Sequence, residues 1–275
     1  MAVYAKNIAY SKYSELLWGN KIMTSVAQLI PERPVAERAA ANEACSPISC
    51  NDCGIFGLCR EVNGADTDLR LPETIVRNRK LLKRGDLLYR AGEPKRAIYA
   101  IRCGSVKTYI LTNDGRMQIT GFHISGELLG LENIASIYSA SEVKVLETTM
   151  VCEVPIDVLE MYCEEEPSVR QQMIKIMSHE ILDNQEMMLL LGKKNADERL
   201  ATFLLSFSQR LQKRNYSPSM FNLSMSRSDI GNYLGMAEET VCRVFTRFQE
   251  DGLLTTERRQ VQIHDLARLK AIARG

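Results

Sequence analysis

Four of the eight cysteines of this 275-residue chain lie close together in the stretch CSPISCNDCGIFGLC. Three of them, Cys50, Cys53 and Cys59, have the spacing C-x2-C-x5-C, and Cys45 precedes them. Thiolates at this density are typical ligands of a soft metal ion or an iron–sulfur cluster. On spacing alone, a zinc site formed by these four cysteines and an iron–sulfur site are equally good interpretations.

The composition indicates a soluble globular protein of about two domains, with 45% hydrophobic and 25% charged residues and a net charge of +1. The N-terminus lacks the apolar core of a secretory signal, and no run of 18 apolar residues occurs. We therefore expect a cytoplasmic chain with no membrane partner. In that compartment clustered cysteines are ligands or redox groups rather than a disulfide framework.

The sequence pattern around the cysteines divides this part of the chain into segments with different expected structures. Residues 1–44 form an N-terminal arm, and residues 45–64 form the cysteine-rich segment. A helix is expected from Asp66 to about Arg79. After it, short β-rich runs alternate with glycine-containing turns, which predicts an antiparallel β-roll within residues 65–165. Asn113-Asp114-Gly115 is a hairpin turn in that roll.

Residues 166–192 have a helical period, with Pro167 in the first turn and no interruption before Gly192. An apolar seam with one polar member recurs at alternating spacings of three and four, typical of a coiled-coil dimer: Ile174, Met177, Ile181, Asn184, Met188 and Leu191. A second stripe is expected to face the roll: Val169, Met173, Ile176, Met187 and Leu190. The alternative is one wide core-facing stripe in a monomer.

Residues 193–275 combine helices with a short β-rich end, and 14 Lys and Arg residues outnumber 9 Asp and Glu residues there. This local excess indicates an anionic partner. Ser226 is a predicted N-cap with Asp229 three residues on, and Gly235 stands where a helix-turn-helix needs its turn. The LLTTERRQVQIHD run predicts a strand pair behind it, so a winged helix-turn-helix is expected.

The second helix of this motif would present Glu239, Cys242 and Arg243 outward near its N-terminus, with Arg247 one turn on. Arg bonds bidentately to guanine and Glu accepts from cytosine, so these three are predicted to read bases. Ser228, Arg247 and the Arg258-Arg259 pair are predicted phosphate contacts. The alternative is a structural helical hairpin with ordinary surface charge.

Together these segments resemble the fumarate and nitrate reduction regulator (FNR) family within the catabolite activator protein (CRP/FNR) superfamily. The resemblance rests on CNDCGIFGLC and on matches between about residues 71 and 251: AIYAIRCGSVKTY, QITGFHISGELLG, LETTMVCEVP, VRQQMIKIMSHEI, LLLGKKNADERLA and SRSDIGNYLGMAEETVCRVFTRFQEDG. It implies an α+β fold with an N-terminal β-roll like that of cyclic-nucleotide-binding domains, a long dimerisation helix and the winged helix-turn-helix.

The resemblance implies a [4Fe–4S] cluster held by Cys50, Cys53, Cys59 and Cys152, with Cys45 outside the ligand set. Residue spacing alone would not have selected Cys152. The resemblance also implies an oxygen-responsive homodimer that binds a palindromic DNA operator resembling TTGAT-N4-ATCAA, controls anaerobic genes and contacts RNA polymerase through the roll's hairpin.

Departures from the family pattern qualify this expectation. Cys242 replaces the usual serine of the base-reading motif, and a thiol is a weak donor, so readout of the outer T positions should change. Asn184 replaces the usual acid of the seam, so the cluster-free protein is expected to dimerise more readily than is usual in the family.

Two other interpretations of the function are open to test. Gly126-Glu127 match the cyclic-AMP receptors of the superfamily, but the following stretch offers Lys144 and no Arg for a cyclic phosphate. The alternative is therefore a CRP-like regulator with structural zinc or an unidentified small-molecule ligand. An enzyme is not expected, since no dinucleotide fingerprint and no catalytic grouping occurs in the sequence.

Overall fold

The computed structural model describes residues 78–94, 97–136 and 138–275 of the chain. The predicted arm, the cysteine-rich segment and most of the helix expected from Asp66 lie outside the described residues. The expected end of that helix is wrong, because Asn78 and Arg79 begin strand β1 (Asn78–Leu82). Arg79 is paired with Cys152 of the neighbouring strand, and this long-range ladder outweighs the local helical preference.

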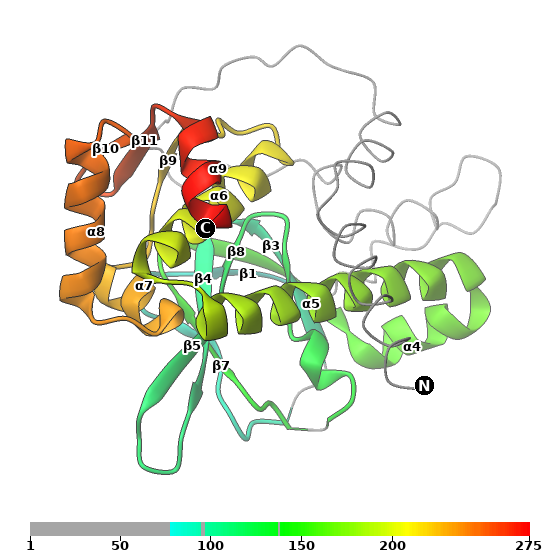
Figure 1. The fold of residues 1–275 in the computed structure, drawn as a ribbon. Helices are drawn as coiled ribbons and strands as arrows, with labels where there is room; N and C mark the ends of the chain where they lie inside the picture. Colours follow the sequence, from blue (N-terminus) through cyan, green and yellow to red (C-terminus); the bar gives the residue numbers. More distant parts are fainter. Residues whose placement is uncertain (1–77, 95–96, 137) are drawn as a thin grey trace, which may run out of the picture. The chain divides into compact units, whose positions relative to one another are not determined.

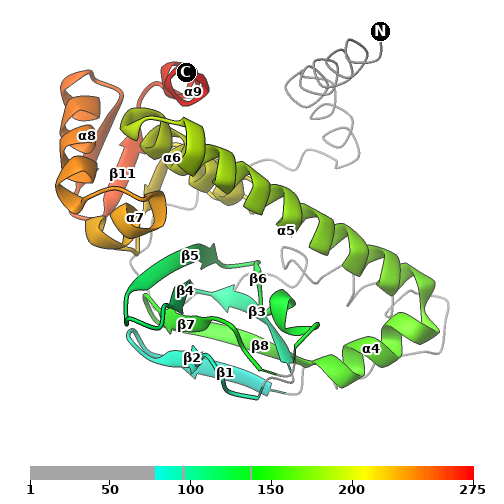
Figure 2. The ribbon, with the colours of Figure 1, turned by 60° about the horizontal axis from the view of Figure 1, so that its bottom comes forward.

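Two four-stranded antiparallel sheets make up the predicted β-roll (Figures 1 and 2). The first has the order β1-β8-β3-β6, with β8 (Thr149–Pro155), β3 (Ala97–Cys103) and β6 (Leu128–Leu129). The second has the order β2-β7-β4-β5, with β2 (Leu87–Tyr89), β7 (Glu142–Val145), β4 (Ser105–Leu111) and β5 (Met117–Ile124). A short 3-10 helix, η2 (Leu131–Asn133), follows β6.

The roll is stabilised by apolar side chains contributed by strands of both sheets. Ile101 and Val151 from the first sheet share a buried cluster with Val106, Val143 and Val145 from the second. The predicted hairpin turn between β4 and β5 is confirmed. Gly115 there has a φ of 80°, a left-handed conformation that glycine adopts without steric cost.

Helix α4 (Ile156–Glu165) leads into the 27-residue helix α5 (Pro167–Lys193), which runs past the roll to the C-terminal helices (Figure 2). Pro167 occupies the first turn of α5, as predicted. The stripe expected to face the roll does so in its first part, where Val169, Met173 and Ile176 pack with residues of the roll. At the other end, Leu190 and Met187 join a cluster formed by residues of both the roll and the C-terminal helices.

The C-terminal part begins with α6 (Ala196–Gln212), on which Leu200, Phe203, Leu204 and Phe207 are buried. The helix pair α7 (Arg227–Leu234) and α8 (Glu238–Glu250) follows. The predicted strand pair is β10 (Leu254–Glu257) with β11 (Gln260–Ile263).

Two elements of the C-terminal part were not predicted. Strand β9 (Met220–Asn222) adds a third strand beside β11, and α9 (Leu266–Arg274) packs on α6. Leu269 and Ala273 form the buried side of α9. Of the helices in the described part of the chain, none is long and apolar enough to cross a membrane.

Candidate nucleic-acid interface and metal centre

Helices α7 and α8 form the predicted helix-turn-helix. Ser226 Oγ accepts a hydrogen bond from the Asp229 amide at 3.0 Å, and the Asp229 carboxylate accepts from the Ser226 amide at 3.2 Å. This reciprocal capping box satisfies amides at the start of α7 that have no partner within the helix. Gly235 ends α7 with a φ of 62°, the left-handed conformation of a helix C-cap. The sequence prediction of cap and turn is therefore confirmed.

Helix α8 divides into a buried and an exposed face. Val241, Val244, Phe245 and Phe248 are buried in the hydrophobic core. The opposite face forms a shallow groove on the surface. The groove is lined by the three predicted base readers, Glu239, Cys242 and Arg243, and by three further residues of α8: Thr246, Arg247 and Glu250. A helix exposed in this way has the geometry needed to enter a DNA major groove.

Two exposed ion pairs hold the arginines of α8. Arg243 Nη2 lies 2.5 Å from Glu239 Oε1, one turn away on the same helix. Arg247 pairs with Asp197 near the start of α6. Exposed ion pairs of this kind contribute at most about 1 kcal/mol. Each pair can therefore open when a phosphate or a base edge replaces the carboxylate.

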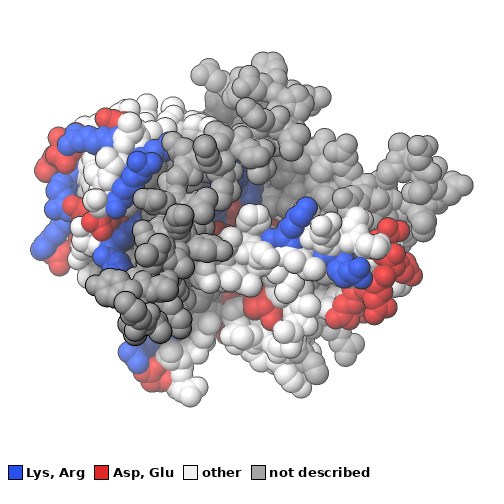
Figure 3. All heavy atoms as spheres, turned by 45° about the vertical axis from the view of Figure 1, so that its right-hand side comes forward, with Lys and Arg blue, Asp and Glu red and all other residues white. Residues whose placement is uncertain are grey.

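The remaining predicted backbone contacts are accessible as well. Ser228 is exposed in the first turn of α7, where helix amides favour an anion. Arg258 and Arg259 are exposed in the tight turn between β10 and β11, and Arg258 has a positive φ of 54°. In Figure 3, basic side chains mixed with acidic ones gather over the part of the surface at the left.

Cys152 lies in β8, with Arg79 and Ala100 as its partners on the two neighbouring strands. Its side chain is only 7% exposed. It belongs to a buried cluster that also contains Val169 and Met173 of α5. The roll therefore places Cys152 against the first turns of the long helix, a relationship that residue spacing did not reveal.

The other three predicted cluster ligands, Cys50, Cys53 and Cys59, lie outside the described residues. Within the described part of the chain, no group of three or more His, Cys, Asp or Glu side chains could hold a metal ion. On α4, Cys163 is a half-buried free thiol, and burial raises its pKa. Four thiolates are a donor set that fits a cubane iron–sulfur cluster, and Cys152 is the predicted ligand that lies within the described residues.

The predicted seam of α5 is exposed along its length. Exposed fractions are 58% for Ile174, 59% for Ile181 and 72% for Met188, and Asn184 is exposed as well. Leu182 and Leu189 are also exposed, at 48% and 58%, although the seam pattern did not include them. The apolar surface of α5 is therefore wider than one coiled-coil seam.

Comparisons with known proteins agree with this geometry. Residues 79–166 match the model of the cyclic nucleotide-binding domain, and residues 198–272 match that of the Crp-like helix-turn-helix domain. Transcriptional activator protein Anr of Pseudomonas aeruginosa is 45% identical over 82% of this chain and 93% of its own length. The fumarate and nitrate reduction regulatory protein of Escherichia coli K12 is 40% identical over 89% of this chain and 97% of its own.

The chain belongs to the CRP/FNR family of transcription regulators. Among solved structures it is similar to FixK2 from Bradyrhizobium japonicum, with 32% identity, a TM-score of 0.66, and coverage of 71% of this chain and 96% of that one. A CooA mutant from Carboxydothermus hydrogenoformans shares the fold at 18% identity and a TM-score of 0.60, over 78% and 95% of the two chains.

Family membership establishes the coarse function. The relatives are transcription regulators and not enzymes, and the chain is a DNA-binding regulator of FNR type. The predicted α+β architecture, with a β-rich domain followed by helices and a helix-turn-helix, is the architecture of the family. The family also implies that the chain dimerises.

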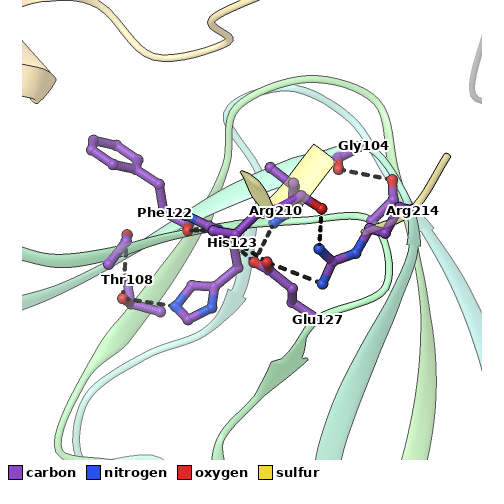
Figure 4. A network of polar contacts seen from close by, with 10 residues as sticks. Gly104, Thr108, Phe122, His123, Glu127, Arg210 and Arg214 are labelled. Atoms are coloured by element: carbon purple, nitrogen blue, oxygen red, sulfur yellow. Dashed lines mark hydrogen bonds and ion pairs between the residues drawn. The ribbon is translucent and has the colours of Figure 1, made fainter. Parts of the chain in front are cut away.

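In this CRP/FNR regulator, Glu127 of the Gly-Glu loop is bonded to the DNA-binding part of the same chain (Figure 4). Its carboxylate accepts from Arg210 Nε at 2.8 Å and lies 3.1 Å from Arg214 Nη2, both on or directly after α6. Arg210 also donates to the Phe122 carbonyl at 2.6 Å. Burial would raise the pKa of Glu127, but the two guanidinium groups lower it to about 2.

The sequence did not reveal the partners of Glu127, because Arg210 lies 83 positions away. The Glu127 carboxylate, which matches the Gly-Glu loop of the cyclic-AMP receptors, is thus bonded to arginines of its own chain. A second polar contact joins the same two parts: Lys107 Nζ of β4 donates to Asp229 Oδ1 of α7 at 2.6 Å. Both side chains are largely buried, at 11% and 17% exposure.

Proposed function

We propose that the chain is an oxygen-responsive regulator that holds a [4Fe–4S] cluster on Cys50, Cys53, Cys59 and Cys152. With the cluster intact, it binds as a homodimer to a palindromic DNA site resembling TTGAT-N4-ATCAA and controls anaerobic gene expression. Support comes from the cysteine pattern, from the exposed reading face of α8 and from relatives named for fumarate and nitrate reduction or as activators of the Anr type.

The observation that carries this proposal is the place of Cys152. Its side chain shares a buried cluster with Val169 and Met173, which lie in the first turns of α5. A ligand bond that displaces β8 at Cys152 would therefore also displace the side chains through which α5 packs on the roll. Close-packed interiors transmit such a displacement rather than absorb it.

When bound, the cluster would supply an oxygen-labile link between the cysteine-rich segment and β8. The protein's own residues convert that link into dimer stability. Val169, Met173 and Leu190 fix one face of α5 on its own chain, while Ile174, Ile181 and Met188 present the other face outward. Because only a dimer spaces two α8 helices for a palindrome, a change in dimer affinity becomes a change in DNA affinity by linkage.

Contact with RNA polymerase is proposed for the β4–β5 hairpin. Ile110 and Leu111, next to the Asn113–Gly115 turn, are exposed at 41% and 46%. Apolar side chains at an exposed hairpin suit a transient protein contact. This part of the proposal is tested by the ability of hairpin variants to bind DNA normally while failing to activate transcription.

The ligand set is tested by purifying the protein anaerobically and measuring iron, sulfide and visible absorbance. We expect about four iron and four sulfide per chain, with broad visible absorbance that bleaches in air. Cys152→Ala should abolish the absorbance, and Cys45→Ala, the matched control, should keep it. A colourless protein with one tightly bound zinc would support the alternative regulator with a structural zinc site and overturn the iron–sulfur proposal.

A further inference from the structure

One arginine lies where three helices meet at the end of α5. Arg199, in the first turns of α6, donates from Nη2 to the carbonyl of Leu191 near the end of α5 at 2.8 Å, and from Nε to the carbonyl of Lys194 at 2.9 Å. Its Nη1 donates to the carbonyls of Leu234 at 2.9 Å and Gly235 at 3.3 Å. The latter two residues end α7 and begin the turn to α8.

The four carbonyls lie at the C-terminal ends of two helices, Leu191 and Lys194 at the end of α5 and Leu234 and Gly235 at the end of α7. The last four carbonyls of an α-helix have no donor within the helix, and the helix dipole makes that end favour a cation. A single guanidinium thus caps the C-terminal ends of α5 and α7 at once. Its planar, fixed fork of five donors is suited to this, whereas a lysine ammonium is a flexible point charge.

The Gly235 turn is closely packed against this junction. A Cβ added at Gly235 would lie 3.5 Å from Arg199 Nη1 and 3.6 Å from Leu191 Cδ2. Two residues before Arg199 along α6, Asp197 pairs with Arg247 of α8. The start of α6 therefore contacts the end of α5, the turn of the helix-turn-helix and the recognition helix itself.

We propose that Arg199 is a positioning residue for DNA recognition. By joining the end of α5 to the end of α7, it fixes the orientation of the helix-turn-helix relative to the dimerisation helix. It thereby sets the half-site spacing that the two α8 helices of a dimer can read. The inference deepens the proposed function, because it rests on the binding of a palindrome by a dimer, but it does not depend on the cluster or on the TTGAT sequence.

The test compares spacer preference in wild type, Arg199→Lys, Arg199→Gln and the control Lys193→Gln. Lys193 is exposed at the same end of α5, so its substitution removes a charge from that helix end without touching Arg199. A half-site is first selected by the wild-type protein from random DNA. Affinities are then measured for palindromes with spacers of about three, four, five and six base pairs, and for a single half-site.

Wild type and Lys193→Gln should bind the palindrome with one spacer about tenfold more tightly than those with the other spacers. Both Arg199 variants should bind that palindrome about tenfold more weakly than wild type and should show no spacer preference. Half-site binding should stay within about twofold of wild type, which also shows that the variants fold. Equal losses on half-site and palindrome, or a spacer preference that both variants retain, would overturn the proposal. Failure of wild type itself to bind any palindrome would instead contradict the proposed dimeric function.

Discussion

Glu127 of the roll and Arg210 of α6 form a two-bond ion pair, with Nε–Oε1 and Nη2–Oε2 distances of 2.8 and 2.5 Å. The side chains are only 16% and 26% exposed. A buried carboxylate held by two guanidinium groups fastens the DNA-binding part to the roll. It does so at the loop that matches the cyclic-nucleotide-binding pattern.

Removing the charge of the Glu127 carboxylate should lower the stability of the folded protein by an amount that depends on pH. Because the folded-state pKa of Glu127 is lowered from 4.5 to about 2, its stabilisation is present above pH 4.5 and is lost as pH falls towards 2. Glu127→Gln should therefore lower the free energy of unfolding by about 3 kcal/mol at pH 7. Urea unfolding at several pH values measures this, and a wild-type–variant difference that stays constant down to pH 3 would contradict it.

Lys107→Met should destabilise the packing of α7 on β4. The substitution removes the lysine partner of the largely buried Asp229 carboxylate, which keeps its hydrogen bond from the Ser226 amide. Losing one member of a buried pair is expected to cost about 3 kcal/mol. Thermal unfolding measures the loss, and Lys144→Met on the neighbouring strand β7 serves as the control. Equal melting temperatures for the Lys107→Met variant and wild type would show that the pair contributes nothing.

The dimer seam predicts a sharp contrast between two adjacent positions. Ile181→Glu places like charges at the proposed twofold contact and should weaken dimerisation by about 100-fold, with a parallel loss of palindrome binding. Leu182→Glu alters a neighbouring exposed leucine outside the seam and should leave the dimer intact. Sedimentation velocity on anaerobically purified protein distinguishes the two. Dissociation by Leu182→Glu with no effect of Ile181→Glu would place the interface on the other exposed stripe.

Replacing Cys242 by Ser should sharpen DNA sequence preference. Cys242 is exposed in the reading groove of α8 between Glu239 and Arg243, and its thiol is a weaker donor than a hydroxyl. We expect Cys242→Ser to discriminate the outer T positions by about fivefold more than wild type, while the Glu239- and Arg243-dependent core preference is unchanged. Binding measured on operators substituted one base at a time tests this, with Thr246→Ser as the control. Identical base preferences in wild type and Cys242→Ser would refute a reading role for position 242.

What the sequence predicts well here is local. The capping box of Ser226 and Asp229, the Gly235 turn and the two faces of α5 follow from spacings within one helix, because their side chains interact across one or two turns. The partners of Glu127 and Arg199 do not follow from spacing, since they lie between 5 and 87 positions away and depend on how helices meet. Strand β1 likewise replaced an expected helix end because its partner is β8. Cys152 was identified through family resemblance, and only the fold relates it to Val169 and Met173.

The neutral seam residue Asn184 should affect how tightly the cluster-free protein dimerises. Asn184 is exposed on α5, where an acid would repel its mate across the twofold axis. We expect cluster-free wild type to dimerise about tenfold more tightly than cluster-free Asn184→Asp. Sedimentation of both proteins after air exposure measures the difference, and a wild type that is fully monomeric in air would contradict it.

The central claim is that oxygen controls DNA binding through the link between the cysteine-rich segment and Cys152. The most direct test is anaerobic binding of purified protein to a TTGAT-N4-ATCAA duplex, repeated on the same sample after exposure to air. The account predicts at least about tenfold weaker binding after air, and equally weak binding by Cys152→Ala under both conditions. Equal affinity of the wild-type protein before and after air would contradict it.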